Sequence, residues 1–169
     1  MRTKFFAEAS PAAHPAAQLS RFWRYAPLVV WMSLIFLASS TELSAANTSK
    51  VLRPVLLWLL PHASEKTIGI VHFLIRKAAH FTEYAIFALL AARAFLGSSR
   101  QALRSHWLLA ALLLITLYSL SDEFHQSFVP TRTASIYDSL IDTAGGFVAL
   151  VFLALWRASH DKQTRSASL

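Results

Sequence analysis

The sequence predicts an all-α membrane protein, a polytopic bundle of four transmembrane helices. Of its 169 residues, 55% are hydrophobic and only 15% are charged, whereas soluble globular domains average about 25% charged residues. The mean hydropathy is +0.44. Uncharged, mostly apolar runs lie at residues 28–41, 84–92, 105–121 and 143–156. Because a spanning helix needs roughly 20 mostly apolar residues, each run with its flanks is predicted to cross a membrane.

The N-terminal part of the chain is predicted to hold a tail and the first spanning helix. Residues 1–20 contain two prolines and many alanines, which is typical of a disordered terminal segment. Arg21 and Arg24 then precede the apolar run 26–40. A cleavable signal peptide is the alternative interpretation, since residues 43–45, Leu-Ser-Ala, could serve as a cleavage site. We favour a spanning helix because the segment before the run would be unusually long for a signal peptide.

A loop is predicted over residues 41–76, followed by three helices. Residues 51–61 within the loop are apolar but too short to span a bilayer, so an interfacial or re-entrant helix is expected there. The later helices are predicted over residues 76–96, 105–125 and 137–157. Gly97 follows the first of them, which is a common signal for a helix end. Gly145-Gly146 in the last helix is expected to allow a neighbouring helix to approach closely.

The distribution of basic residues predicts that both termini are cytoplasmic. The net charge is +7, and lysine and arginine are enriched on the cytoplasmic side of membrane proteins. They lie before the first helix, between the second and third, and after the fourth: Arg2, Lys4, Arg21, Arg24, Arg93, Arg100, Arg104, Arg157, Lys162 and Arg165. The segment 122–142 has four acidic residues but only one basic residue, Arg132. The predicted domains are a disordered cytoplasmic tail at 1–20, a membrane domain at 21–158 and a cytoplasmic tail at 159–169.

Composition also argues against two classes of function. The basic residues lie at the edges of apolar runs and not in a stripe with interleaved aromatic residues, and no nucleic-acid recognition module is present. Nucleic-acid binding is therefore not expected. The chain has no cysteine, so a disulfide framework and thiolate metal sites are excluded.

Polar side chains are predicted to converge at the outer ends of three helices. Counting about 20 residues along each helix from its cytoplasmic arginine brings these residues to similar depth: Lys77, His80 and Glu83; Asp122, Glu123, His125 and Gln126; Asp138 and Asp142. Arg132 lies on the connecting loop. Most of them are spaced three or four residues apart, so members of each group share a helical face. Because charged groups at membrane depth usually mark function, the sequence predicts a site on the outer face.

Three interpretations of this group of residues remain open. It can be an ion-pair network that holds helix ends together, because charged groups at membrane depth must be paired or hydrogen-bonded. Its closely spaced carboxylates can instead support acid–base chemistry. Finally, His80-x-x-Glu83 and Asp122-x-x-His125 form a ligand set that suits zinc or manganese, although Lys77 beside His80 opposes a bound cation. No metal ligand is assigned, and the sequence identifies no cofactor.

Three ordered motifs resemble the VanZ-like family of small bacterial integral membrane proteins. They are KAAHFTEY at residues 77–84, SDEFHQSFVPTR at 121–132 and DSLIDTAG at 138–145, and the resemblance extends over roughly residues 28–156. It implies a multi-pass protein of the bacterial cytoplasmic membrane. The founding member is associated with reduced susceptibility to the glycopeptide teicoplanin, so antibiotic resistance is part of what the resemblance implies.

The resemblance also implies which positions matter. The signature polar and glycine positions are Lys77, His80, Glu83, Asp122, Glu123, Gln126, Arg132, Asp138 and Gly145. Two departures stand out. Thr131 occupies a position where family members often have glycine, so the turn before the loop arginine can differ. Asp142 occupies a position where asparagine is frequent, which adds a negative charge to the predicted site.

The predicted function is to act on, or bind, a cell-envelope component such as a lipid head group or a lipid-linked wall precursor. In an enzyme, Glu83 or Glu123 would be the general acid/base, with His80 as its partner. The remaining predicted site residues would bind the ligand: Lys77 and Arg132 as cations for phosphate or carboxylate, with Asp122, Gln126 and Asp138. The alternative is a non-catalytic lipid- or glycopeptide-binding or structural protein. Transport is less favoured, because four helices would need an oligomer, and the sequence does not determine the oligomeric state.

Overall fold

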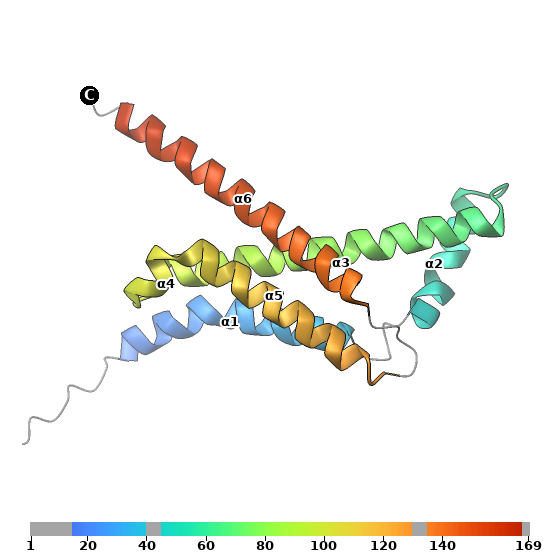
Figure 1. Ribbon diagram of the computed structural model, residues 1–169, viewed down its shortest axis with the longest axis horizontal. Coiled ribbons are helices and arrows are strands. Elements are labelled where there is room, and N and C mark those ends of the chain that lie inside the picture. The colour runs from blue at the N-terminus through green and yellow to red at the C-terminus, as the bar shows by residue number, and fades with distance from the viewer. Residues whose placement is uncertain (1–14, 40–44, 130–134, 167–169) are drawn as a thin grey trace, which may run out of the picture.

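The chain is all-helical throughout the residues that the computed structural model describes, which are 15–39, 45–129 and 135–166 (Figure 1). These residues form six helices: α1 (Pro15–Ala38), α2 (Ala45–Leu59), α3 (Glu65–Leu96), α4 (Gln101–Ser105), α5 (Trp107–Gln126) and α6 (Ile136–Ser166). The predicted fold class, all-α, is confirmed.

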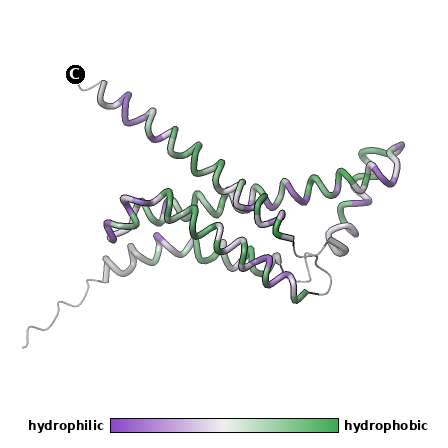
Figure 2. Tube along the Cα trace, viewed as in Figure 1, coloured by the Kyte–Doolittle hydropathy of each residue, from purple (hydrophilic) through white to green (hydrophobic). Residues whose placement is uncertain are grey.

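Three helices are long and apolar enough to cross a membrane: α3, α5 and the part of α6 over Ile136–Thr164. The apolar part of α1, Phe22–Ala38, is shorter. Apolar residues predominate in the middle of these helices. Hydrophilic residues are concentrated near α4 and at the C-terminal end of α6 (Figure 2). Length and composition therefore support three spans, and a fourth span by α1 remains a prediction.

The largest departure from the predicted boundaries is the start of α3. It begins at Glu65, well before residue 76, so part of the predicted loop is helical. Its N-cap is Ser64, whose Oγ accepts a hydrogen bond from the Thr67 amide at 3.2 Å. This cap and the acidic Glu65 in the first turn both favour a helix start. At 1.5 Å per residue, the 32 residues of α3 are longer than a bilayer core of about 30 Å.

Other boundaries differ by smaller amounts. The helix predicted within residues 51–61 exists as part of α2, which begins earlier, at Ala45. Helix α1 begins at Pro15, inside the predicted tail, and residues 1–14 lie outside the described residues. Helix α6 continues to Ser166, beyond the predicted end at 157, because its polar C-terminal segment remains helical. The short helix α4 was not predicted.

Helix α3 is the centre of the bundle, since it packs against α6, α5, α1 and α2. In Figure 1, α1, α5 and the C-terminal part of α3 run side by side, while α2 lies beside the N-terminal part of α3. Small residues of α3 allow this close packing, and larger side chains fill the space between helices. The fully buried core residues are Tyr84, Phe87, Ala88, Ala91, Ala92, Ala94, Ala111 and Ile115.

Helix α6 crosses α3 and then diverges from the bundle (Figure 1), and the glycine pair lies at the close approach. A Cβ atom on Gly145 would lie 2.2 Å from the backbone oxygen of Phe81, which is far inside van der Waals contact. A Cβ atom on Gly146 would lie 2.2 Å from Cδ1 of Ile115. The expected close helix approach is confirmed, and it brings the N-terminal part of α6 against the middle of α3.

Hydrogen bonds attach α1 to the other helices. Tyr118 of α5 donates from its hydroxyl to the Met32 carbonyl at 2.6 Å. Trp31 donates from Nε1 to the Glu83 carbonyl of α3 at 3.0 Å. The C-terminal end of α1 is thereby fixed beside the middle of α3, where the charged residues lie.

We expect Tyr118→Phe to lower the free energy of unfolding by about 0.6–1.5 kcal/mol, because it removes one interhelical hydrogen bond and leaves the Met32 carbonyl without that donor. Unfolding by sodium dodecyl sulfate in mixed micelles measures the change. Tyr137→Phe is the matched control, since Tyr137 is 72% exposed. Equal stabilities for the two variants would contradict this account of the α1–α5 contact.

Candidate functional site

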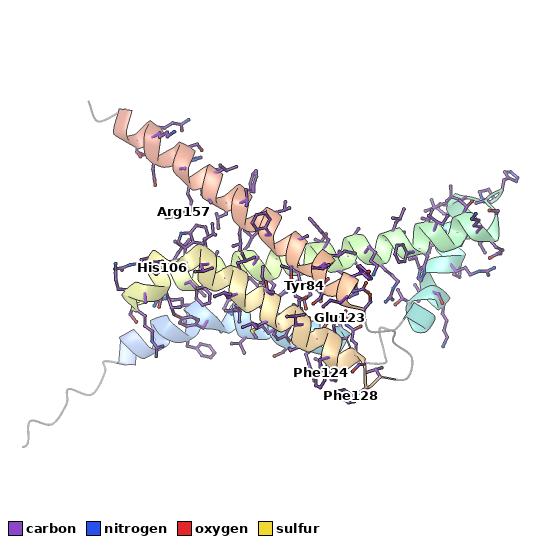
Figure 3. All side chains as sticks on the ribbon, viewed as in Figure 1. Tyr84, His106, Glu123, Phe124, Phe128 and Arg157 are labelled. Atoms are coloured by element: carbon purple, nitrogen blue, oxygen red, sulfur yellow. The ribbon has the colours of Figure 1, made fainter. Side chains whose placement is uncertain are left out.

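A cluster of charged and polar side chains lies where α3, α5 and α6 meet. Figure 3 shows Tyr84 of α3 and Glu123 of α5 beside the N-terminal part of α6. We define the polar cluster as Lys77, His80, Glu83, Asp122, Glu123, Gln126, Asp138 and Asp142. Glu123 of α5 interacts electrostatically with Asp138 and Asp142 of α6 and with Asp122 of its own helix. The structure thus brings together side chains that the sequence predicted to converge.

Two side-chain pairs connect α3 to α6. Lys77 forms an ion pair with Asp138 through Nζ and Oδ1. His80 Nδ1 lies 3.5 Å from Asp142 Oδ1, and the Asp142 side chain is fully buried. Lys77 and His80 lie one turn apart on α3, and their partners lie one turn apart on α6. The two pairs therefore join successive turns of the two helices. These pairs lie next to the Gly145 crossing, which sets the distance between the helices.

The polar residues of α5 are buried behind these pairs. Gln126 Nε2 donates to Asp122 Oδ2 at 2.9 Å and to Ser39 Oγ at 3.5 Å. Glu123 Oε2 accepts a hydrogen bond from the Ser135 amide at 2.7 Å, directly before α6 begins. Glu123 therefore anchors the start of α6, and Gln126 connects α5 to the end of α1.

Several buried oxygens in the cluster, and one beside it on Tyr84, form no hydrogen bond with the described residues. They are Tyr84 Oη, Asp122 Oδ1, Glu123 Oε1 and both carboxylate oxygens of Asp142. Buried polar groups without partners cost stability, so these oxygens call for further polar partners.

A pocket of about 190 Å³ opens beside the cluster, between α1, α2 and α3. It is lined by Ala38, Ser39, Thr48, Arg76, Ala79, His80 and Glu83, a set that we call the head-group pocket. Arg76 Nη1 donates to Thr48 Oγ1 at 3.4 Å, which ties α2 to α3 at the pocket wall. One guanidinium, one imidazole, one carboxylate and two hydroxyls thus line a small space. Ligand pockets typically measure about 300–1,000 Å³, so this one suits a small polar group.

The predicted site residues divide into four groups. His80 and Glu83 line the head-group pocket. Asp122, Glu123 and Gln126 are buried behind it, and Lys77 is paired with Asp138 and also lies 5.1 Å from the Phe73 ring centre. Arg132 falls within residues 130–134, outside the described residues.

Sequence reasoning missed three pocket residues: Arg76, Ser39 and Thr48. Arg76 lies at the predicted boundary between the loop and the helix, so its place within α3 could not be seen from the sequence. Ser39 follows the apolar run of α1, and a polar residue at that point is a usable signal. Thr48 gives no signal of its own, because its position depends on how α2 packs against α3.

The metal interpretation gains no support from the described residues. Within them, no group of three histidine or carboxylate side chains is arranged to hold a metal ion. His125, which that interpretation required, stacks instead on Phe36 of α1 with ring centres 4.5 Å apart. Asp122 accepts its hydrogen bond from Gln126.

The fold and the cluster define a class: all-helical membrane proteins with a buried polar site at a helix crossing. A comparison with protein-family models agrees, since the VanZ/LLP1 family model matches residues 22–157. The chain belongs to the VanZ-like family and is a membrane protein of that family. The matched region runs from the apolar part of α1 into α6 and includes the whole polar cluster. Comparisons with curated proteins and with solved structures gave no match.

Proposed function

We propose that this protein handles a phosphate-bearing cell-envelope component, a lipid head group or a lipid-linked wall precursor, in the head-group pocket. The observation that carries the proposal is the pocket itself. Arg76, His80 and Glu83 lie together on α3, beside helices suited to a membrane. A guanidinium grips phosphate with two parallel hydrogen bonds. An imidazole beside a carboxylate can move a proton.

Each polar residue receives a role under this proposal. Arg76 holds the phosphate, while Ser39 and Thr48 offer hydroxyls to the same group. Asp142 orients His80 from behind, because its carboxylate faces Nδ1. Glu83 is then the preferred general acid/base. Glu123, for which the sequence predicted a catalytic role, is better placed to position α6 through the Ser135 amide.

We also propose the placement in the bacterial cytoplasmic membrane, with four spans and the polar cluster at the outer side. The opposite end of the bundle supports this orientation. There Arg93 donates to the Arg24 carbonyl at 3.5 Å, and Tyr25 donates to Ser98 Oγ at 3.0 Å. The N-terminal part of α1 and the C-terminal end of α3 therefore form one basic end, which fits the cytoplasmic side.

The experiment is quantitative mass spectrometry of envelope lipids and lipid-linked precursors in a strain lacking the gene. The strain is complemented with wild type, Glu83→Gln, Glu123→Gln or Glu65→Gln. We expect one species to accumulate in the deletion and to clear with wild type but not with Glu83→Gln. Glu65→Gln is the control and should clear it, because Glu65 forms an exposed ion pair with Arg53, and such pairs contribute little.

Glu123→Gln separates positioning from chemistry. A glutamine oxygen can still accept from the Ser135 amide, so we expect this variant to keep most of the activity. The second candidate function is a binding protein that shields its ligand without turnover, which would connect to glycopeptide susceptibility. It is favoured if, in the same strain, Glu83→Gln restores the wild-type glycopeptide susceptibility while Arg76→Gln does not. An unchanged inventory in the deletion strain would contradict the catalytic proposal.

A further inference from the structure

A second, apolar depression adjoins the head-group pocket. It is lined by Trp31, Ile75, Ala78, Ala79, Thr82, Glu83 and Ile86, and we call it the chain groove. It lies between α1 and α3 and measures about 530 Å³. Ala79 and Glu83 line both spaces. The groove and the pocket therefore form one continuous site with a polar end and an apolar end.

The shape of the groove follows from the sequence of α3. Ile75, Ala79, Thr82 and Ile86 are spaced four, three and four residues apart, so they form one stripe along the helix. The middle of the stripe is small and its ends are large, which leaves a hollow. Trp31 forms the facing wall, and its indole is held in place by the hydrogen bond from Nε1 to the Glu83 carbonyl.

The groove opens sideways, away from the core of the bundle. Ile75 and Ile86 are 40% and 37% exposed, and Ala78, Ala79 and Thr82 are also exposed. These residues belong to α3, one of the helices suited to span a membrane. An apolar hollow on the side of such a helix faces hydrocarbon chains, whereas the adjoining pocket presents a guanidinium and hydroxyls.

We propose that the two spaces bind one membrane amphiphile, with a phosphate diester in the head-group pocket and one hydrocarbon chain in the chain groove. The inference rests on the proposed function, because the head-group pocket is its polar half. A pocket of about 190 Å³ cannot hold a whole lipid, so the chain must lie outside it, and the groove is the continuous apolar exit. The ligand then enters from the bilayer between α1 and α3.

The test is native mass spectrometry of the full-length protein in detergent, titrated with palmitoyl-oleoyl-phosphatidylglycerol. Thr82→Trp fills the groove without touching the pocket. The Thr82 hydroxyl donates to the Ala78 carbonyl of its own helix, at 2.8 Å. We expect wild type to retain one lipid, and Thr82→Trp to weaken this retention at least tenfold. Arg76→Gln should weaken lipid retention to a similar extent, because it removes the guanidinium that binds the phosphate.

Two controls accompany these variants. Leu113→Trp adds the same ring to α5 at a position that is 53% exposed, and it should retain lipid as wild type does. Thr82→Val keeps the size of the threonine and should also retain lipid. If Thr82→Trp does not fold, Ala78→Phe fills the same groove and takes its place.

The outcomes separate the inference from the proposed function. If Arg76→Gln loses the lipid while Thr82→Trp keeps it, the chain lies elsewhere, and only the inference is overturned. If the wild-type protein retains no more lipid than the Arg76→Gln variant, both the inference and the proposed function are overturned. If Thr82→Trp dissociates a dimer without loss of lipid, the groove is covered by a second copy of the chain, and the inference is again overturned.

Discussion

Gly145→Ala is expected to lower the free energy of unfolding by about 3 kcal/mol. The new Cβ atom would lie 2.2 Å from the Phe81 oxygen and 2.9 Å from its carbonyl carbon. These are backbone atoms of α3, so no side-chain rotation relieves the clash and the two helices must separate. Overpacking of this kind typically costs about 1–3 kcal/mol, and a clash with rigid backbone belongs at the upper end. Unfolding by sodium dodecyl sulfate in mixed micelles measures the loss.

The other glycines of the chain provide matched controls. In Gly146→Ala the new Cβ atom would contact the end of the Ile115 side chain. Because that side chain can rotate, the loss of stability should be smaller. Gly69→Ala meets no described atom within 4 Å and should be neutral or stabilising, because alanine favours helix by about 1 kcal/mol over glycine. A stability order in which Gly145→Ala is no worse than Gly146→Ala would contradict the close crossing of α6 over α3.

His80→Ala is expected to lower the free energy of unfolding by about 3 kcal/mol. It leaves the Asp142 carboxylate fully buried without the imidazole that lies 3.5 Å away. Breaking a buried pair by removing one partner costs about 3–5 kcal/mol. The loss should fall at the lower end of this range because the His80 side chain is 22% exposed. The same mixed-micelle unfolding experiment measures it.

Asp142→Asn in the His80→Ala background tests the reason for this loss. If the cost comes from an unpaired buried charge, neutralising Asp142 should recover about 2 kcal/mol. The substitution also fits the family resemblance, in which asparagine is frequent at this position. A double variant that is no more stable than His80→Ala would show that lost packing of the imidazole, and not the buried carboxylate, causes the effect.

The helices were predictable to the extent that local sequence determines them. The apolar runs identified α5 and the middle of α3 and α6 correctly, because a long apolar segment has few alternatives to a membrane helix. The start of α3 was missed because counting about 20 residues back from Arg93 placed it near residue 76. The helix instead begins at the Ser64 N-cap, because a helix can extend beyond the membrane and need not end where the apolar run ends.

The site was predictable as a location but not in its detail. Counting residues from the cytoplasmic arginines predicted that Lys77, His80 and Asp138 lie at a similar depth along their helices. In the structure Lys77 forms an ion pair with Asp138. Adjacent residues on a helix point about 100° apart, so which of Arg76 and Lys77 faces the pocket depends on where α2 and α6 pack. Such packing cannot be derived from local periodicity.

The most direct test of the central claim uses the His80→Ala/Asp142→Asn double variant, once its recovered stability has been verified. The claim is that the polar cluster serves a ligand and does not merely hold the helices together. The measurement is the envelope-lipid inventory of the deletion strain complemented with this variant. We predict that the inventory stays as in the deletion, because the fold is restored while the imidazole of the head-group pocket is missing. A return to the wild-type inventory would contradict the claim and assign the cluster a structural role.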